Sequence, residues 1–350
     1  MATQAENAAA SSGQTQEILA KPALLFAGQG SQRPGMGKKI AENNPEAMAL
    51  WQKAEKASGL PLRAIYWEGE ESEMSATGAL QPALTVFNYT LWNEFRKKTG
   101  IRPIAAAGHS LGEFSAFAAA KAITPERAIE LTALRGRLMA EADPQGKGAM
   151  AAILKLDASQ VEALVKEAAA ESGELLIAAN FNTPSQLVIS GARNAVDLAC
   201  KKAKTLRGRS IPLAVSGAFH SPMMNEANAE FALALEKTEW RDPEFPVYCN
   251  VNAMPAANAK AAKLGLLPQM VSPVRWIELI RNLYLSGARW WLDIGPRPVL
   301  GKMVRPDLEG FASEADNLRV EQLNSLSDLQ NFVSRVEEPN AGQRNTVDRV

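Results

Sequence analysis

Residues 102–122 read RPIAAAGHSLGEFSAFAAAKA, and they join a short apolar run to an alanine-rich stretch through a serine between two glycines. The run before Gly108 is β-like, and the stretch after Gly112 consists of good helix formers. The pentapeptide from Gly108 to Gly112 fits the G-x-S-x-G motif, in which a strand and a helix approach closely and the serine hydroxyl lies at the turn between them. The segment therefore predicts a strand, a sharp turn that carries Ser110, and a helix.

Strands and helices alternate on both sides of this turn. Strand-like runs occupy residues 22–28, 245–251 and 290–295. Helical patterns occupy residues 43–57, 81–98, 124–141 and 225–238. Such alternation is typical of an α/β domain with a parallel sheet.

The order of predicted strands and helices changes between residues 147 and 215. Strand-like runs lie at 148–156, 174–180, 185–190 and 210–215. A helix that Asp157 can cap follows the first run, and a helix with an apolar face follows the third. The resulting order, β-α-β-β-α-β, predicts a small ferredoxin-like subdomain inserted into the larger domain.

These patterns divide the chain into four parts. We expect a large subdomain from residues 21–146 and 216–335, and a small one from 147–215. We expect residues 1–20 to be a disordered tail and residues 336–350 to be a frayed one. The start has neither a basic segment nor a continuous apolar core, and no run reaches the length of a membrane span. We therefore expect a soluble, cytoplasmic protein.

Overall charge and cysteine content exclude several classes of function. Lys plus Arg equals Asp plus Glu at 38 each, so the overall balance indicates neither a nucleic-acid nor a membrane partner. Cys200 and Cys249 are too few and too far apart for a metal cluster or a disulfide framework. We expect both to be reduced, buried thiols and the protein to bind no metal.

A serine hydroxyl needs a base to become a nucleophile near neutral pH, and this chain has two histidines. His109 precedes Ser110, and adjacent side chains on an extended chain point to opposite sides. This leaves His220, in GAFHSPMM just after a strand-like run, either as the base or as a structural histidine.

The helix pattern at 124–141 carries a cation on its apolar face. Arg135 shares that face with Leu131, Leu138 and Met139. Its guanidinium either reaches to water, pairs with an internal acid, or meets an anion.

Residues 200–209, CKKAKTLRGR, form the most basic segment and contain no acid. We call its charged residues the basic cluster: Lys201, Lys202, Lys204, Arg207 and Arg209. Cations are favourable at helix C-termini, which is one explanation of the cluster. The other is the docking of an acidic partner.

Six motifs together resemble a known family. They are FAGQGSQRPGMG, TGALQPAL, GHSLGEFSA, ALRGRLM, GAFHSPMM and DIGPRPVL, and they occur in the order seen in malonyl-CoA:acyl carrier protein transacylases. The resemblance spans residues 22–310. It implies an α/β-hydrolase-like parallel-sheet core with an inserted ferredoxin-like subdomain, and a malonyltransferase of fatty-acid or polyketide biosynthesis.

The resemblance also implies roles in catalysis. Ser110 would be acylated, and His220 would be its base, oriented by the backbone carbonyl of Gln269. The backbone N–H groups of Gln29 and Leu111 would stabilise the oxyanion. The family's usual proline before this glycine-rich loop is Ala27 here. An acyl hydrolase of the same fold is the alternative activity.

Substrate and partner sites follow from the same resemblance. Arg135 would grip the malonyl carboxylate, and Met139, Phe219, Gln81 and Asn182 would contribute to substrate binding. Phe219 is the position associated with unbranched malonyl groups. The basic cluster, extended by Lys302 and Arg305, would dock the acyl carrier protein. No cofactor is implied, and we expect a monomer.

Overall fold

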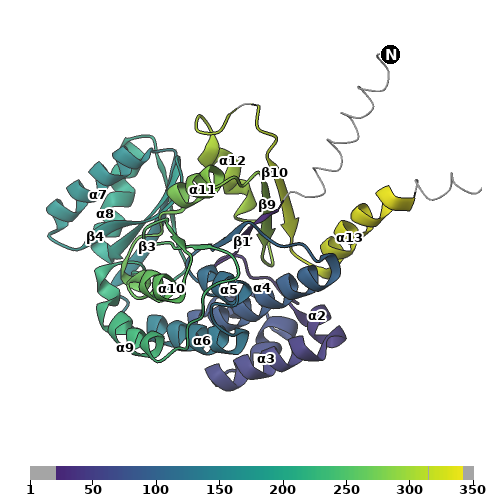
Figure 1. Cartoon of the computed structure of the whole chain (residues 1–350). Coiled ribbons are helices and arrows are strands. Elements are labelled where there is room, and N and C mark those ends of the chain that lie inside the picture. Colours follow the sequence, from purple (N-terminus) through teal and green to yellow (C-terminus); the bar gives the residue numbers. More distant parts are fainter. Residues whose placement is uncertain (1–20, 314, 342–350) are drawn as a thin grey trace, which may run out of the picture.

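The computed structural model describes residues 21–313 and 315–341, so the tail predicted at 1–20 and the last part, 342–350, of the tail predicted at 336–350 lie outside the described residues. The larger part is built on a six-stranded sheet of order β10-β9-β1-β2-β7-β8 (Figure 1). Its strands are β1 (Ala23–Phe26), β2 (Ala105–Gly108), β7 (Val247–Tyr248), β8 (Pro255–Ala256), β9 (Trp290–Ile294) and β10 (Arg319–Leu323). All neighbours are parallel except β7 and β8.

Both faces of this sheet are buried under helices. Leu24 and Phe26 of β1 face one apolar core, and Ala23 and Leu25 face another. Such two-sided burial explains why the central strands are continuously apolar rather than alternating. The helices of the first core include α2 (Lys38–Asn43), α3 (Pro45–Ser58), α4 (Thr77–Thr99), α5 (Gly112–Ala119) and α6 (Pro125–Glu141). Those of the second are α11 (Trp276–Leu285) and α12 (Gly301–Leu308).

The remaining helices of the large subdomain lie toward the C-terminus of the chain. They are α9 (Asn225–Glu236), α10 (Ala259–Leu266) and α13 (Leu326–Ala341). Four short helical turns complete the subdomain: η1 (Ala64–Glu68) and η2 (Glu71–Ser75) between α3 and α4, η3 (Pro222–Met224) before α9, and η4 (Gln269–Val271) after α10. Helix α13 continues past residue 336, where we expected the C-terminal tail to begin. Within the described residues, no helix is long and apolar enough to cross a membrane.

A second, antiparallel sheet of order β4-β5-β3-β6 forms the small subdomain. Its elements are β3 (Gly148–Leu154), α7 (Ala158–Ser172), β4 (Leu176–Thr183), β5 (Gln186–Ala192), α8 (Arg193–Thr205) and β6 (Arg209–Pro212). Asp157 caps α7 in a complete capping box with Gln160. The fold prediction, a parallel core with an inserted ferredoxin-like unit, is confirmed.

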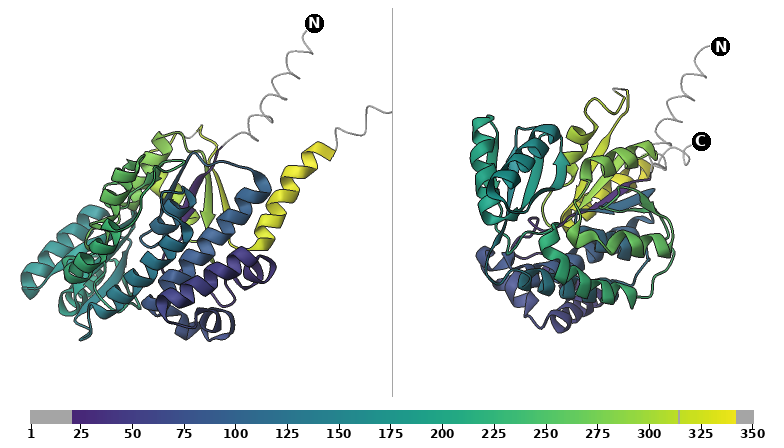
Figure 2. Two further views of the ribbon diagram at one scale, coloured as in Figure 1. Left: turned by 60° about the horizontal axis from the view of Figure 1, so that its bottom comes forward. Right: turned by 90° about the vertical axis from the view of Figure 1, so that its left-hand side faces the viewer.

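The antiparallel sheet separates its own helices from the large subdomain. Ala151 and Ile153 of β3 pack with α7 and α8, whereas Met150 and Ala152 face the larger core. Figure 1 accordingly shows α7 and α8 on the outer side of β3 and β4. Figure 2 shows the teal small subdomain set against one side of the large one. The inner face of this sheet is therefore available to form the wall of a site.

Candidate active site

Ser110 lies in a tight turn between β2 and α5. Its φ of 50° is in the left-handed region, which is rare for residues other than glycine. A Cβ on Gly108 would lie 2.0 Å from the carbonyl carbon of Gly112, and a Cβ on Gly112 would lie 2.0 Å from the Phe26 oxygen. Both glycines are therefore required by the close contact of strand and helix.

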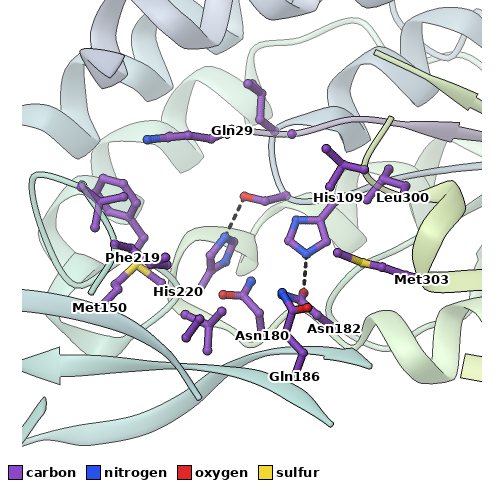
Figure 3. Close-up of a pocket in the computed structure, with 18 of the residues that line it drawn as sticks. Gln29, His109, Met150, Asn180, Asn182, Gln186, Phe219, His220, Leu300 and Met303 are labelled. Carbon is purple, nitrogen blue, oxygen red and sulfur yellow. Dashed lines mark hydrogen bonds between the residues drawn. The ribbon is translucent and has the colours of Figure 1, made fainter. Parts of the chain in front are cut away.

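His220 meets the serine hydroxyl from a distant loop between β6 and η3. Its Nε2 lies 2.7 Å from Ser110 Oγ (Figure 3). Its Nδ1 lies 3.0 Å from the Gln269 carbonyl oxygen and 3.1 Å from that of Ser272. Because carbonyls only accept hydrogen bonds, Nδ1 carries the proton and Nε2 is free to accept one.

Burial also keeps this imidazole neutral. Burial, followed by the nearby charge of Arg135, lowers the pKa of His220 to about 3. A neutral imidazole that faces a hydroxyl can act as a general base at neutral pH.

His109 points away from the serine hydroxyl, as strand alternation predicts. Its Nε2 donates to Asn182 Oδ1 at 2.8 Å (Figure 3), and its ring packs against Trp276. Burial lowers the pKa of His109 as well. Asn182, expected at the substrate, thus both holds this ring and lines the cavity.

Arg135 is 1% exposed, which excludes the alternative that it reaches to water. Its Nη1 donates to Gln81 Oε1 at 2.9 Å, and its Nη2 donates to Gln269 Oε1 at 2.9 Å and Ser110 Oγ at 3.1 Å. All three partners are uncharged, and Nε has no partner among the described residues. Burial lowers the pKa of Arg135 to about 10, so the group is still a cation at neutral pH.

Gln29 and Leu111 are the residues expected to supply the oxyanion donors. Both residues line the cavity that contains Ser110. In residues 21–313 and 315–341, neither backbone N–H has a hydrogen-bond acceptor. The loop before Gln29 is held close to the turn, since a Cβ on Gly28 would lie 2.4 Å from the His109 oxygen. Two free donors at this position can bind a developing oxyanion.

The cavity has a volume of about 240 Å³ and lies between the subdomains. Its wall contains Ser110, His220 and Arg135, and it also contains Met139 and Phe219. Three amide side chains on the β4–β5 hairpin also line it (Figure 3): Asn180, Asn182 and Gln186. Much of the remaining wall is apolar: Met150, Ala152, Val188, Leu213, Val215, Val299, Leu300 and Met303. Gln81 and Gln269 are not in this wall; they lie behind Arg135 and hold it.

Sequence reasoning missed two buried residues that support the turn. Asn250 Oδ1 accepts the Ser110 N–H at 2.6 Å, and its Nδ2 donates to the Gly108 oxygen at 2.7 Å. Glu113 is fully buried in α5 and accepts a 2.7 Å bond from Gln269 Nε2. One signal was available for each: a polar residue directly after a buried strand, and a single acid in an alanine-rich helix.

The basic cluster lies on and after α8. Lys202 is paired with Glu167 and Glu171 of α7 at 2.6 and 2.7 Å, so its charge is already compensated. The other four members are exposed. Helix α8 packs on the sheet face opposite the cavity, but β6 runs from Arg209 toward the cavity wall at Leu213. The end of the cluster near Arg209 is therefore the part closest to the site along the chain.

Lys302 and Arg305 are exposed on α12, beside the wall residue Met303. Arg305 donates to the Leu318 carbonyl. Across the described part of the chain, no group of three or more His, Cys, Asp or Glu side chains is arranged to hold a metal ion.

Comparisons with known proteins agree on one family. A family model described as an acyl transferase domain matches residues 23–338. The malonyl CoA-acyl carrier protein transacylase of Bacillus subtilis (strain 168) is 40% identical over 288 residues, which are 82% of this chain and 90% of that protein. The transacylase of Staphylococcus aureus (strain MW2) is 34% identical, with 82% and 92% covered.

Solved structures give the same result. FabD from Acinetobacter baumannii superposes with a TM-score of 0.82 at 33% identity, covering 91% of this chain and 99% of that one. A malonyl-transacylase solved in complex with its type II PKS acyl-carrier protein has a TM-score of 0.82 at 35% identity, with 90% and 100% covered. Matches of this identity and extent show that the chain is a member of the malonyl-CoA:acyl carrier protein transacylase family of acyltransferases.

Proposed function

We propose that this enzyme transfers malonyl from malonyl-CoA to the phosphopantetheine thiol of an acyl carrier protein, through an ester on Ser110. The observation that carries the proposal is Arg135, a buried cation with uncharged partners beside the hydroxyl of Ser110. A buried charge is costly unless an opposite charge meets it, so this site favours an acyl group with its own carboxylate. The names of the relatives support the same substrate and acceptor.

His220 moves the proton in both half-reactions. Nε2 takes the proton of Ser110 Oγ as this oxygen attacks the thioester carbonyl, and the C–S bond then breaks and CoA leaves as the protonated thiol. In the second half, the carrier thiol gives its proton to Nε2 and attacks the ester. Ser110 leaves and recovers the proton. The Gln269 and Ser272 carbonyls hold the imidazole in the required tautomer throughout.

Both tetrahedral intermediates carry a negative oxygen. The backbone N–H groups of Gln29 and Leu111 are the proposed donors, because they line the cavity next to Ser110 and lack other acceptors in the described ranges. Fixed donors of this kind stabilise charge that develops only in the transition state.

The guanidinium of Arg135 can hold the malonyl carboxylate with two parallel hydrogen bonds. Each such bond contributes about 1.5–3 kcal/mol. Met139 and Phe219 are proposed to contact the acyl group, and Asn182 to contribute to substrate binding, because all three line the cavity. Gln81 is proposed to act through Arg135, which it holds.

Replacing Arg135 with alanine is expected to reverse substrate preference rather than abolish the chemistry. The malonyl carboxylate would be desolvated without a partner, while an acetyl group would no longer face a buried cation. The ratio of kcat/KM for malonyl-CoA to that for acetyl-CoA should fall by at least about a hundredfold, or ~3 kcal/mol. Steady-state kinetics with both substrates measure this ratio.

Arg137 is the matched control for Arg135. It lies two residues further along α6, but it is exposed and pairs with Glu141 and Glu230. Arg137→Ala should leave the ratio unchanged. If Arg135→Ala lowers kcat/KM for both substrates equally, the residue only maintains the structure, and the malonyl proposal loses its structural basis.

The exposed part of the basic cluster is proposed to dock the carrier protein. Reversing two charges, Lys204→Glu with Arg209→Glu, should raise the KM for the carrier protein several-fold and leave acylation by malonyl-CoA unchanged. Lys97→Glu with Lys98→Glu, on exposed positions of α4, is the control with the same change in net charge. Equal effects on both half-reactions, or an equal effect of the control, would exclude docking at this cluster.

Two further expectations remain predictions: a monomeric state and a cytoplasmic location.

A further inference from the structure

Glu113 is a buried acid that the proposed chemistry does not use. It lies three residues after Ser110, on the first turn of α5, and is 0% exposed. Its carboxylate accepts hydrogen bonds from Gln269 Nε2 at 2.7 Å and from the Asn250 backbone N–H at 3.3 Å. An acid placed at this depth is unfavourable unless it is neutral or balanced by a cation.

The Gln269 side chain connects this acid to Arg135. Its Nε2 faces Glu113, and its Oε1 accepts from Arg135 Nη2 at 2.9 Å. Nε2 also donates to the Ser110 carbonyl at 2.9 Å. Because an amide donates only from nitrogen and accepts only at oxygen, a flipped amide would break all three bonds. The amide dipole is thus held between a cation on one side and an acid on the other.

Each charge affects the other across this amide. Burial raises the pKa of Glu113 to about 8, against the hydrogen bond from Gln269 and the charge of Arg135. Burial lowers the pKa of Arg135 to about 10, and the charge of Glu113 opposes that shift. In the described ranges, Arg135 forms no direct ion pair, and Glu113, when it is charged, is a counter-charge that reaches Arg135 only through the Gln269 amide.

We propose that Glu113 is a positioning residue that acts on Arg135 through Gln269 and must be protonated when the substrate's carboxylate binds Arg135, so that wherever Glu113 is charged in the empty site it takes up a proton on binding. The inference rests on the proposed malonyl specificity. In the bound state two carboxylates would share one guanidinium, and like charges at one site raise the pKa of one of them. The proton comes from the solvent: one O–H bond forms on Glu113 as the bond to that proton breaks in the donor, which is hydronium or the buffer acid.

The other titratable groups at this place keep their charge between pH 7 and 9. Arg135 on α6 stays a cation, because its pKa of about 10 is above this range. Cys249, which follows β7 and contacts Glu113, stays a neutral thiol because burial raises its pKa. His220, held by the Gln269 carbonyl, is neutral because its pKa is about 3. Glu113 alone of these four titrates in this window.

The sign of the expected pH effect follows from the raised pKa of Glu113. Below about pH 8 the acid is already protonated in the empty site, and the substrate's carboxylate binds without further cost. Above about pH 8 the acid is charged, and binding requires the uptake of a proton. The kcat/KM for malonyl-CoA should therefore fall with rising pH, and that for acetyl-CoA should not fall for this reason.

The experiment compares the malonyl-to-acetyl ratio of kcat/KM from pH 6.5 to 9 in the wild type and in Glu113→Gln. In the wild type the ratio should fall by up to about tenfold between pH 7 and 9, the change in the protonated fraction of one group with a pKa near 8. In Glu113→Gln the ratio should change less than about twofold. Ionisation of the CoA part is common to the two thioester substrates and cancels in the ratio.

Asp307→Asn is the matched control. Asp307 is also fully buried, and burial raises its pKa to about 8, but it lies on α12 near Arg281. This variant should retain the wild-type pH profile. Parallel profiles in the wild type and Glu113→Gln would overturn the proposal. A wild type without malonyl preference at any pH would instead overturn the proposed function.

A calorimetric measurement does not depend on whether the Glu113 variant folds. Ser110→Ala protein binds substrate without being acylated, so titration in buffers of different ionisation enthalpy counts the protons exchanged on binding. At pH 8, the protein should take up about half a proton more when it binds malonyl-CoA than when it binds acetyl-CoA, as expected for a group with a pKa near 8. Equal proton counts for the two ligands would contradict the proposal.

Discussion

Ser110→Ala is expected to abolish the covalent malonyl-enzyme completely. Among the described residues, Ser110 Oγ is the hydroxyl that lies 2.7 Å from the imidazole of His220, in the wall of the cavity between the subdomains. Without this oxygen no ester can form, and transfer to the carrier protein should fall to background. Intact-mass analysis after exposure to malonyl-CoA measures the ester directly.

Ser115→Ala is the control for this substitution. Ser115 is buried in the same helix, α5, but its hydroxyl contacts Asn88 rather than a histidine. This variant should still form the ester. A malonyl adduct on Ser110→Ala would assign the nucleophile to another residue.

His220→Ala is expected to lower both half-reactions by about a thousandfold or more, at the upper part of the range for general acid–base catalysis. The serine hydroxyl and the carrier thiol would both lose their proton acceptor. Pre-steady-state acylation by malonyl-CoA and discharge by holo carrier protein measure the two steps separately.

The second histidine supplies the comparison. His109 contacts Asn182 and Trp276 instead of the serine hydroxyl. His109→Gln, which retains a donor for Asn182, should keep far more activity than His220→Ala. Near-normal acylation by His220→Ala would refute the role of its imidazole.

Much of the fold could be predicted because local patterns determine it. The G-x-S-x-G turn depends on two glycines that have no room for a side chain: Gly108 lies against the backbone of Gly112, and Gly112 lies against the backbone of Phe26. The order of elements between β3 and β6 follows from periodicity and from a capping box at Asp157. The edge strand β10 and helices α10 to α13 were not predicted, because β10 and helices α10 to α12 are short and α13 continues into the polar segment that was expected to be a tail.

The supporting residues of the site could not be predicted, because they depend on contacts between distant segments. Asn250 holds Ser110 across 140 positions, and Gln269 reaches Glu113 across 156. The resemblance suggested that Gln81 contacts substrate, whereas its side chain lies behind Arg135. The sequence of residues 200–209 places Lys202 with the docking residues, but it does not show that Glu167 and Glu171 of α7 pair with this lysine.

The central claim is that Ser110 carries malonyl from one thiol to another. The most direct test is to form the malonyl-enzyme, remove malonyl-CoA, and follow the label after adding holo acyl carrier protein. We expect the ester to persist in buffer and to pass within seconds to the carrier thiol, with recovery of the free enzyme mass. Loss of the label to water at the same rate with and without the carrier protein would contradict this account and identify an acyl hydrolase.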